Sequence, residues 1–317
     1  MAVGVLSRRD ALASFAGLGL AACGGRKKRA IAVIPKATSH MFWLTVQKGA
    51  FDAGREFNVD ILWNGAASET DFSRQIQIMD SMVAQHVDGI ALAASERNAL
   101  VAAVDRASAA KIPVTVFDSG LDTDKYVSYV ATDNVEAGRM GARTLIELLN
   151  GKGKVGMMMH APGSASTMDR EKGFTEALAA EAPNIKIVAT QYGMSDRAKA
   201  RAAAENILTA HPDIVGIFAS SEPSSIGASL AIQGRGLKDQ VTLVAFDASD
   251  VMIEDLRSGA IDAMIVQDAH RMGYEAVKTL VDKLNGKTPP HRLDLRAARV
   301  QLKDLNEPHV KRLLNLP

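Results

Sequence analysis

Short apolar runs alternate along most of the chain with longer segments in which apolar residues recur every three or four positions. Residues 30–34 form a continuous apolar run, which is typical of a strand buried on both faces of a parallel sheet. Phe72, Ile76, Met79 and Val83 have the spacing of one buried helix face. The pattern predicts strands at 30–34, 59–63, 89–92, 113–117, 155–158, 185–189, 214–218, 241–246 and 263–266. It predicts helices in a segment that contains Phe51 and Phe57, and at 72–83, 98–110, 134–149, 167–181, 196–210, 222–233, 249–258 and 270–285.

The alternation of strands and helices predicts an α/β fold built on parallel sheets with helices on both faces. Because the pattern runs twice with similar length, we expect two Rossmann-like lobes, with the first crossing between them at 126–134. In such sheets, ligands bind beyond the carboxyl ends of the strands. The segments expected at that edge are 35–43, 93–97, 117–121, 160–170, 219–224, 246–250 and 267–270.

The first residues of the chain have the pattern of an export signal. Arg8 and Arg9 precede the apolar stretch 11–22, which is far shorter than the roughly 20 residues that span a bilayer. This arrangement predicts a secretory signal peptide, and the arginine pair resembles the twin-arginine signal. Leu20-Ala21-Ala22-Cys23 resembles the bacterial lipobox, in which the cysteine is lipidated. We therefore expect removal of residues 1–22, a lipid anchor on Cys23, and a periplasmic or cell-surface location.

Composition narrows the range of functions. The formal net charge is only +1, so no nucleic-acid partner is expected. The basic run Arg26-Lys27-Lys28-Arg29 lies in the tether expected at 23–29, where it either contacts lipid headgroups or is a solvated linker. Cys23 is the only cysteine and the seven histidines lack metal-ligand spacing, so no disulfide and no metal site are expected. A chain of this size with 47% hydrophobic residues has enough core for two domains.

The chain carries no recognisable enzyme motif. Gly151-Lys152-Gly153-Lys154-Val155-Gly156 satisfies GxGxxG, but it follows a predicted helix and precedes a predicted strand. A dinucleotide site needs the reverse order, because the pyrophosphate must meet the N-terminus of a helix. We interpret this run as a turn that ends a helix. Neither a phosphate-binding GxxxxGK[ST] loop nor a GxSxG nucleophile turn is present, so we expect neither catalysis nor a cofactor.

Polar and aromatic residues at predicted strand ends suggest ligand binding. Phe42 and Trp43 follow the first strand, and Asp118 and Asp247 end one strand in each half of the chain. Gln267 ends the last strand and offers both a donor and an acceptor. Aromatic rings can face a small ligand, and carboxylates make strong, directional hydrogen bonds to hydroxyl or amine groups. The same residues could instead be core aromatics, helix N-caps and an ordinary sheet-end amide.

These residues and several ordered motifs resemble the periplasmic sugar-binding proteins of the ribose-binding type, which are the receptors of ABC importers. The resemblance covers about residues 30 to 305. It implies the type I periplasmic binding protein fold, in which three hinge strands join two lobes, here near 131–133, 266–269 and 290–293. The motifs are Phe117-Asp118-Ser119-Gly120, Ala131-Thr132-Asp133-Asn134, Gly163-Ser164-Ala165-Ser166-Thr167 with Arg170 and Gly173-Phe174, Leu208-Thr209-Ala210-His211-Pro212-Asp213, Ala245-Phe246-Asp247 and Val266-Gln267-Asp268.

The resemblance also implies a division of the chain and a set of ligand-binding residues. The first lobe would comprise 30–131 and 268–291, and the second 132–267 and 292–317. Ser119 and Met168 stand where the family usually has arginines, and His40 and Ser221 where asparagine is usual. Because two forked guanidinium groups are missing, we expect a sugar, polyol or similar small polar ligand other than ribose. The implied ligand-binding residues are Ser39, His40, Phe42, Trp43, Asp118, Ser119, Thr167, Met168, Arg170, Ser221, Phe246, Asp247 and Gln267.

The expected function is that of a monomeric extracytoplasmic receptor. Its lobes would close on the ligand and present it to the membrane permease of an ABC importer, while the lipid holds the receptor at the membrane. A receptor for a membrane sensor kinase is the alternative. Regulators of the lac-repressor type share the two-lobe fold, but they need an N-terminal DNA-binding segment of about 50–60 residues. Here the first predicted strand already begins at residue 30, behind the expected signal peptide, so a regulator of this type is not expected.

Overall fold

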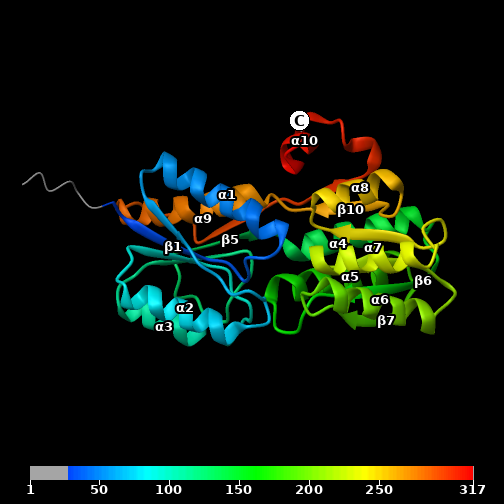
Figure 1. The fold of residues 1–317 in the computed structure, drawn as a ribbon, viewed down its shortest axis with the longest axis horizontal. Helices are drawn as coiled ribbons and strands as arrows, with labels where there is room; N and C mark the ends of the chain where they lie inside the picture. Colours follow the sequence, from blue (N-terminus) through cyan, green and yellow to red (C-terminus); the bar gives the residue numbers. More distant parts are fainter. Residues whose placement is uncertain (1–27, 317) are drawn as a thin grey trace, which may run out of the picture.

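The structure is a computed structural model that describes residues 28–316, in which two α/β lobes lie side by side (Figure 1). The signal peptide expected at 1–22, the lipidated Cys23 and most of the tether at 23–29 lie outside the described residues. No helix within 28–316 has the length and apolar character needed to cross a membrane.

The first lobe is built on a six-stranded parallel sheet with the order β11-β5-β4-β3-β1-β2. Two elements from the end of the chain, α9 and β11, complete this lobe. Its elements are β1 (Ala30–Ile34), α1 (Met41–Glu56), β2 (Asp60–Trp63), α2 (Phe72–Ala84), β3 (Gly89–Leu92), α3 (Val101–Ala109), β4 (Val114–Phe117), β5 (Ser128–Thr132), α9 (Ala269–Leu284) and β11 (Arg292–Leu295).

The second lobe repeats this plan with the order β12-β10-β9-β8-β6-β7, and only β12 runs antiparallel to its neighbour. The short helix α10 packs on this lobe through Val310 and Leu314. Its elements are α4 (Asn134–Leu148), β6 (Gly153–Met159), α5 (Ala165–Glu181), β7 (Ile185–Tyr192), α6 (Arg197–Ala210), β8 (Ile214–Ala219), α7 (Glu222–Gly234), β9 (Thr242–Phe246), α8 (Asp250–Ser258), β10 (Ala263–Val266), β12 (Ala298–Val300), a 3-10 turn (Leu302–Asp304) and α10 (Pro308–Leu314).

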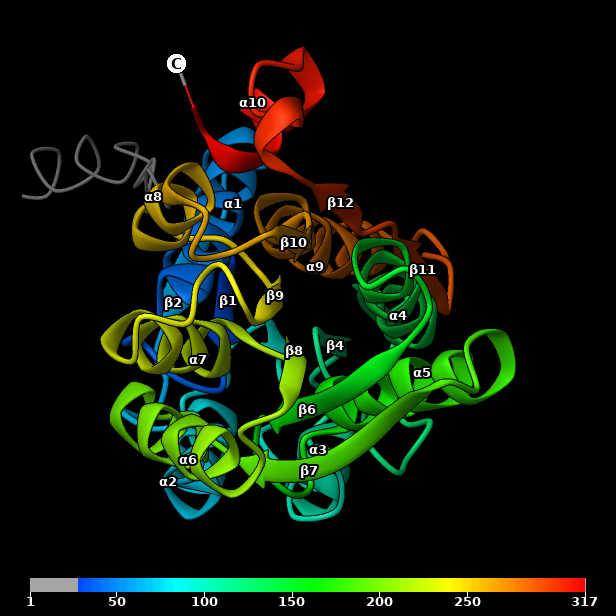
Figure 2. The same ribbon diagram turned by 90° about the vertical axis from the view of Figure 1, so that its right-hand side faces the viewer.

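Alternate residues of each buried strand face different helix layers. In β1, Ile31 and Val33 pack with α1 and α9, while Ala32 and Ile34 pack with α2 and α3 on the opposite face. Successive side chains of a strand point to opposite faces, so a strand covered on both faces must be apolar throughout. In the second lobe, α4 and α5 cover one face and α6, α7 and α8 the other (Figure 2).

The chain crosses between the lobes three times, between β5 and α4, between β10 and α9, and between β11 and β12. The first two crossings lie at the expected positions near 131–133 and 266–269. The third is different: residues 292–295 pair with β5 in the first sheet, so the expected boundary at residue 292 was wrong. Because β11 is an edge strand of alternating exposed and less exposed residues, its sequence lacks the apolar run that marks the other strands.

All nine expected strands are present, but β5, β11 and β12 were not predicted from the sequence. β5 lies within the segment 126–134, which was expected only as a crossing. The GxGxxG run begins after the end of α4 and continues into β6, which starts at Gly153, and both Gly151 and Gly153 have positive φ. This position confirms that the run ends a helix and does not form a phosphate-binding loop.

Candidate functional site

A cavity lies between the lobes at the carboxyl ends of both sheets, and we call it the central cavity. Its free volume is about 30 Å³, far below the roughly 300–1,000 Å³ of small-molecule pockets, because side chains of both lobes close tightly around it. Aromatic, cationic, anionic and hydroxyl side chains from both lobes surround it. They are Lys36, His40, Phe42, Trp43, Glu69, Asp118, His160, Ser166, Thr167, Arg170, Ser221, Glu222, Pro223, Asp247 and Gln267.

Asp118 and Asp247 occupy equivalent places in the two lobes. Each follows the last residue of a strand, β4 and β9 respectively, and each has a left-handed backbone with φ of 59° and 71°. The Asp118 N–H donates to the carbonyl of Val130, and the Asp247 N–H donates to that of Ile265, both at 2.9 Å. Aspartate tolerates this backbone region better than most residues do. The turn therefore fixes a buried carboxylate at the same strand end in each lobe.

Lys36, in the loop after β1, links the first lobe to the second. Its buried ammonium lies 2.9 Å from Oδ2 of Asp118 and donates to the hydroxyls of Ser164 and Ser166 at 3.1 and 3.0 Å. The hydroxyl of Ser119 accepts a further bond from the backbone N–H of Ser166 across the same interface. A buried charge is stable only with such partners, so these contacts favour the arrangement in which the lobes are together.

Glu69 connects another group of side chains across the cavity. It accepts from Nε1 of Trp43 at 2.8 Å, and its second oxygen lies 2.9 Å from Nε2 of His160 in the other lobe. Nδ1 of His160 faces the Ser221 hydroxyl at 2.9 Å. Burial alone would raise the pKa of Glu69, but the neighbouring His160, Lys36 and His40 outweigh it and lower the pKa well below its ordinary value.

Arg170 lies against the aromatic wall of the cavity. Its guanidinium carbon is 4.0 Å from the centre of the Phe246 ring. Its Nε donates to Oδ1 of Asn134 at 2.8 Å, and another nitrogen donates to the carbonyl of Ser220 at 3.0 Å. Because a guanidinium has five donors and two are used here, the remaining N–H groups are available to a ligand.

Gln267 holds the carboxylate of Asp247 next to a hinge strand. Its Nε2 donates to Oδ1 of Asp247 at 2.7 Å, and its Oε1 accepts from the hydroxyl of Thr132 in β5 at 2.7 Å. Oδ2 of Asp247 also accepts from the backbone N–H of Glu222 at 2.9 Å. Burial raises the pKa of Asp247, and these bonds and Arg170 only partly oppose it.

Nine of the thirteen expected residues line the central cavity: His40, Phe42, Trp43, Asp118, Thr167, Arg170, Ser221, Asp247 and Gln267. Four do not line it, for different reasons. Ser39 is exposed and donates to the carbonyl of Ala67, while Met168 is 40% exposed on α5. Ser119 lies at the lobe interface, and Phe246 is fully buried beneath Arg170. That any of the thirteen binds a ligand stays a prediction.

Four charged or titratable residues of the cavity were not predicted from the sequence. Lys36, His160 and Glu222 fall within the segments expected at the binding edge, but no motif drew attention to them. Glu69 lies in the loop after β2, which follows a strand end like the others. The rule that ligands bind at strand ends applies to this loop too, but the segments expected at the binding edge did not include it. Among residues 28–316, no three His, Cys, Asp or Glu side chains are grouped to hold a metal ion.

The chain belongs to the periplasmic binding protein domain family, whose model matches residues 31–288. This membership agrees with the family expected from the sequence and indicates a location outside the cytoplasm. It also confirms the two-lobed α/β fold.

Known relatives span nearly the whole chain. The D-ribose/D-allose-binding protein of Pseudomonas aeruginosa is 29% identical, over 84% of this chain and 86% of the relative. The D-allose-binding periplasmic protein of Escherichia coli is 30% identical, over 82% and 86%.

Solved structures of transport proteins resemble the fold closely. A carbohydrate transporter solute-binding protein from Agrobacterium radiobacter, in complex with D-arabinose, superposes with a TM-score of 0.89. It is 32% identical, and the match covers 92% of this chain and all of that one. An ABC transporter solute-binding protein from Agrobacterium vitis, with bound D-fucose, has a TM-score of 0.87 at 33% identity, covering 90% and 99%. These relatives are binding proteins, which agrees with the expectation that this chain is not an enzyme.

Proposed function

We propose that the protein is the extracytoplasmic receptor of an ABC importer and that it binds a monosaccharide or a polyol of similar size in the central cavity. The observation that carries this proposal is the convergence of two strand-end aspartates, one from each lobe, with Arg170 and an aromatic wall around one small buried space. Carboxylate and guanidinium groups hydrogen-bond hydroxyls with strength and direction, while aromatic faces cover the apolar side of a sugar ring.

The balance of charge favours a neutral ligand. Lys36 is paired with Asp118, Glu69 faces His160, and the carboxylate of Glu222 is paired with Arg197. Asp247 and Arg170 remain as one anion and one cation. Because a charged ligand would enter a buried space without a dedicated counter-charge, its desolvation would not be offset. Sugars and polyols avoid this cost.

Binding would work by closure of the lobes. The ligand would contact Asp118 from the first lobe and Asp247 from the second, and it can bridge the two only when they are together. Binding therefore shifts the population toward the closed form by the difference in affinity between the two forms. The closed receptor would then dock on the membrane permease.

A thermal-shift screen followed by calorimetry tests the ligand class. D-Arabinose, D-fucose, D-tagatose, D-allose, D-ribose and sugar alcohols are compared with amino acids and purines. A ligand that binds only the folded state raises the melting temperature. We expect a shift for at least one polyhydroxylated compound; shifts with amino acids or purines alone would contradict the proposal.

We also propose that the protein is a monomer anchored by a lipid on Cys23 and exported by the twin-arginine route. The sequence of residues 7–23 supports the anchor and the route. The Cys23→Ser variant is expected to leave the membrane fraction, and replacing Arg8 and Arg9 by lysine is expected to stop export. An unchanged membrane association of the Cys23→Ser variant would contradict the anchor.

Static light scattering of the purified protein measures its molar mass and so tests the proposed monomeric state.

A further inference from the structure

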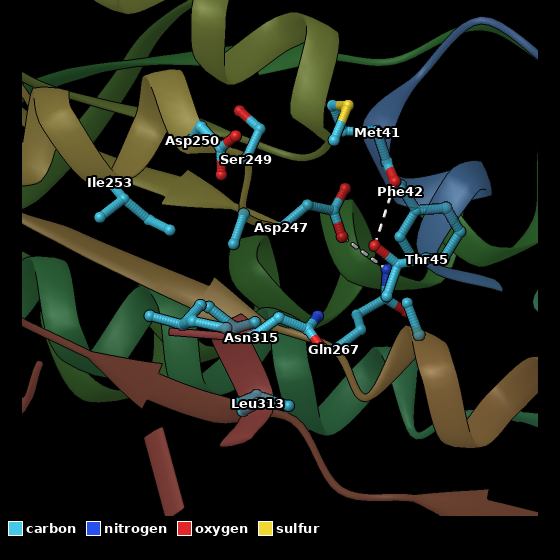
Figure 3. Close-up of a pocket in the computed structure, with 14 residues that line it drawn as sticks. Met41, Phe42, Thr45, Asp247, Ser249, Asp250, Ile253, Gln267, Leu313 and Asn315 are labelled. Atoms are coloured by element: carbon cyan, nitrogen blue, oxygen red, sulfur yellow. Dashed lines mark hydrogen bonds between the residues drawn. The ribbon is translucent and has the colours of Figure 1, made fainter. Parts of the chain in front are cut away.

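Beside the central cavity lies a second, larger space that we call the α10 groove. It lies between the first turn of α1, the loop 247–250 with the start of α8, and residues 313–315 at the end of α10. Its free volume is about 160 Å³, against about 30 Å³ for the central cavity. Figure 3 shows Asp247 and Gln267 between α1 on one side and α8 on the other.

The two spaces share a wall. Phe42, Asp247 and Gln267 line both of them. The bond from Nε2 of Gln267 to Oδ1 of Asp247, 2.7 Å long, belongs to this wall. The two spaces are therefore neighbours, and a ligand that bonds to this pair in the central cavity lies next to the α10 groove.

The groove has polar groups that the protein leaves unpaired. Within residues 28–316, the carboxylate of Asp250 and the side-chain amide of Asn315 have no hydrogen bond or ion pair, and both residues are exposed. The hydroxyl of Ser249 accepts only a long bond of 3.4 Å, from the backbone N–H of Met252. A purely apolar occupant would remove water from these groups without replacing its hydrogen bonds. An occupant with hydroxyl groups would replace them.

The same groove offers apolar surface between these polar groups. Met41 is 39% exposed at the start of α1, and Leu313 and the buried Ile253 line the opposite side. Alternating apolar and hydrogen-bonding surface suits a ring that carries hydroxyls at its rim and C–H groups on its faces. The chemistry of the groove therefore matches that of the central cavity.

We propose that the α10 groove is a second binding subsite that takes the second sugar ring of a disaccharide whose first ring occupies the central cavity. The inference rests on the proposed function, because it needs a sugar in that cavity. The C-terminal segment holds Asn315 in place through Val310 and Leu314, which are buried on the second lobe. Since α1 belongs to the first lobe, the subsite is complete only when the lobes are together.

Calorimetry with the purified protein tests the subsite. The monosaccharide that binds best is compared with disaccharides built from it, for the unaltered protein and for Asn315→Ala and Asp250→Asn. Loss of one hydrogen bond is expected to weaken disaccharide binding by about 2- to 10-fold in each variant. Monosaccharide binding should stay unchanged. Asn306→Ala is the matched control, because Asn306 is also exposed and lies in the same C-terminal segment outside the groove.

The outcomes separate the two proposals. Monosaccharide binding without disaccharide binding overturns the subsite and leaves the proposed function intact. Disaccharide binding that neither variant weakens, or that Asn306→Ala weakens equally, also overturns it. If sugars of neither size bind, the proposed function fails and the subsite fails with it.

Discussion

At the scale of single residues, the candidate site depends on buried charged groups whose positions are fixed by turns and by partners in the other lobe. Asp118 and Asp247 have positive φ, which is rare outside glycine and is frequent at functional sites. Lys36 and Glu69 lie at strand ends of the first lobe and contact residues of the second. The two aspartates and Glu69 each give a testable consequence.

Replacing either aspartate by asparagine should weaken sugar binding. Asparagine tolerates the left-handed backbone, so Asp118→Asn and Asp247→Asn change the charge and the acceptors without adding strain. We expect a loss of about 1–3 kcal/mol of binding free energy for each, measured by calorimetry with the best-binding sugar. Asp239→Asn is the control, because Asp239 is exposed outside the cavity. Unchanged affinity in both site variants would show that the cavity is not the binding site.

Glu69 should make the stability of the protein sensitive to acid. Its pKa is lowered in the folded state, so its contribution is complete above its ordinary value of 4.5 and is lost as the pH falls. Glu69→Gln is expected to be about 1–3 kcal/mol less stable at neutral pH. It should also lose less stability between about pH 5 and pH 3 than the unaltered protein.

Urea unfolding at several pH values measures this difference. Glu307→Gln is the matched control, because Glu307 is exposed and its side chain does not cap α10. Parallel pH profiles for Glu69→Gln and the unaltered protein would mean that Glu69 has an ordinary pKa.

At the scale of elements, each lobe contains a helix pair whose close contact depends on glycine. In the first lobe, a Cβ on Gly49 of α1 would lie 1.9 Å from the carbonyl oxygen of His270 in α9. In the second lobe, a Cβ on Gly138 of α4 would lie 2.0 Å from the carbonyl oxygen of Arg170 in α5. Because the neighbouring atoms are backbone, they cannot rotate away. The second pair matters for the site, since α5 carries Thr167 and Arg170.

Gly138→Ala should therefore reduce both stability and sugar affinity. The added methyl group must push α5 away from α4, at a cost of about 1–3 kcal/mol, and it displaces Arg170 from the cavity. Thermal unfolding and calorimetry measure the two effects. Gly234→Ala in α7 is the control, because a Cβ there meets only the flexible end of Arg201 at 3.5 Å. Equal behaviour of the two variants would contradict the tight-contact argument.

At the scale of the whole molecule, the two lobes meet through polar bonds at several places around the cavity. These include Lys36 with Ser164 and Ser166, and Glu69 with His160. The backbone N–H of Arg97 also donates to the carbonyl of Gly163 across the interface. Three segments cross between the lobes, and a hinge built on them is what the proposed closure requires.

Addition of the best-binding sugar should make the protein more compact in solution. We expect a smaller radius of gyration in small-angle X-ray scattering, because bound ligand shifts the population toward the closed form. Asp118→Asn at the same sugar concentration should show less compaction, since fewer of its molecules are occupied. A radius that does not change in the unaltered protein at saturation would argue against closure by the ligand.

The sequence by itself determined most of the fold. Apolar runs such as residues 30–34 identified the strands buried on both faces, because such strands cannot tolerate polar residues on either side. The ends of these strands marked the binding edge, and together with the family resemblance they predicted that Asp118, Asp247 and Gln267 lie there. Edge strands were missed, since β11 has exposed residues and no continuous apolar run.

Only the tertiary structure decided which residues share the central cavity. Glu69 and His160 are 91 residues apart in sequence, and their contact depends on how two lobes meet. Ser119 likewise lies at the lobe interface and does not line the cavity, and Met168 is exposed on the surface of α5. Local patterns report which face of an element is buried, whereas partners across a lobe interface leave no periodic signal in either segment. The sequence thus determined the edge at which the candidate site lies, and the tertiary structure decided its charged network.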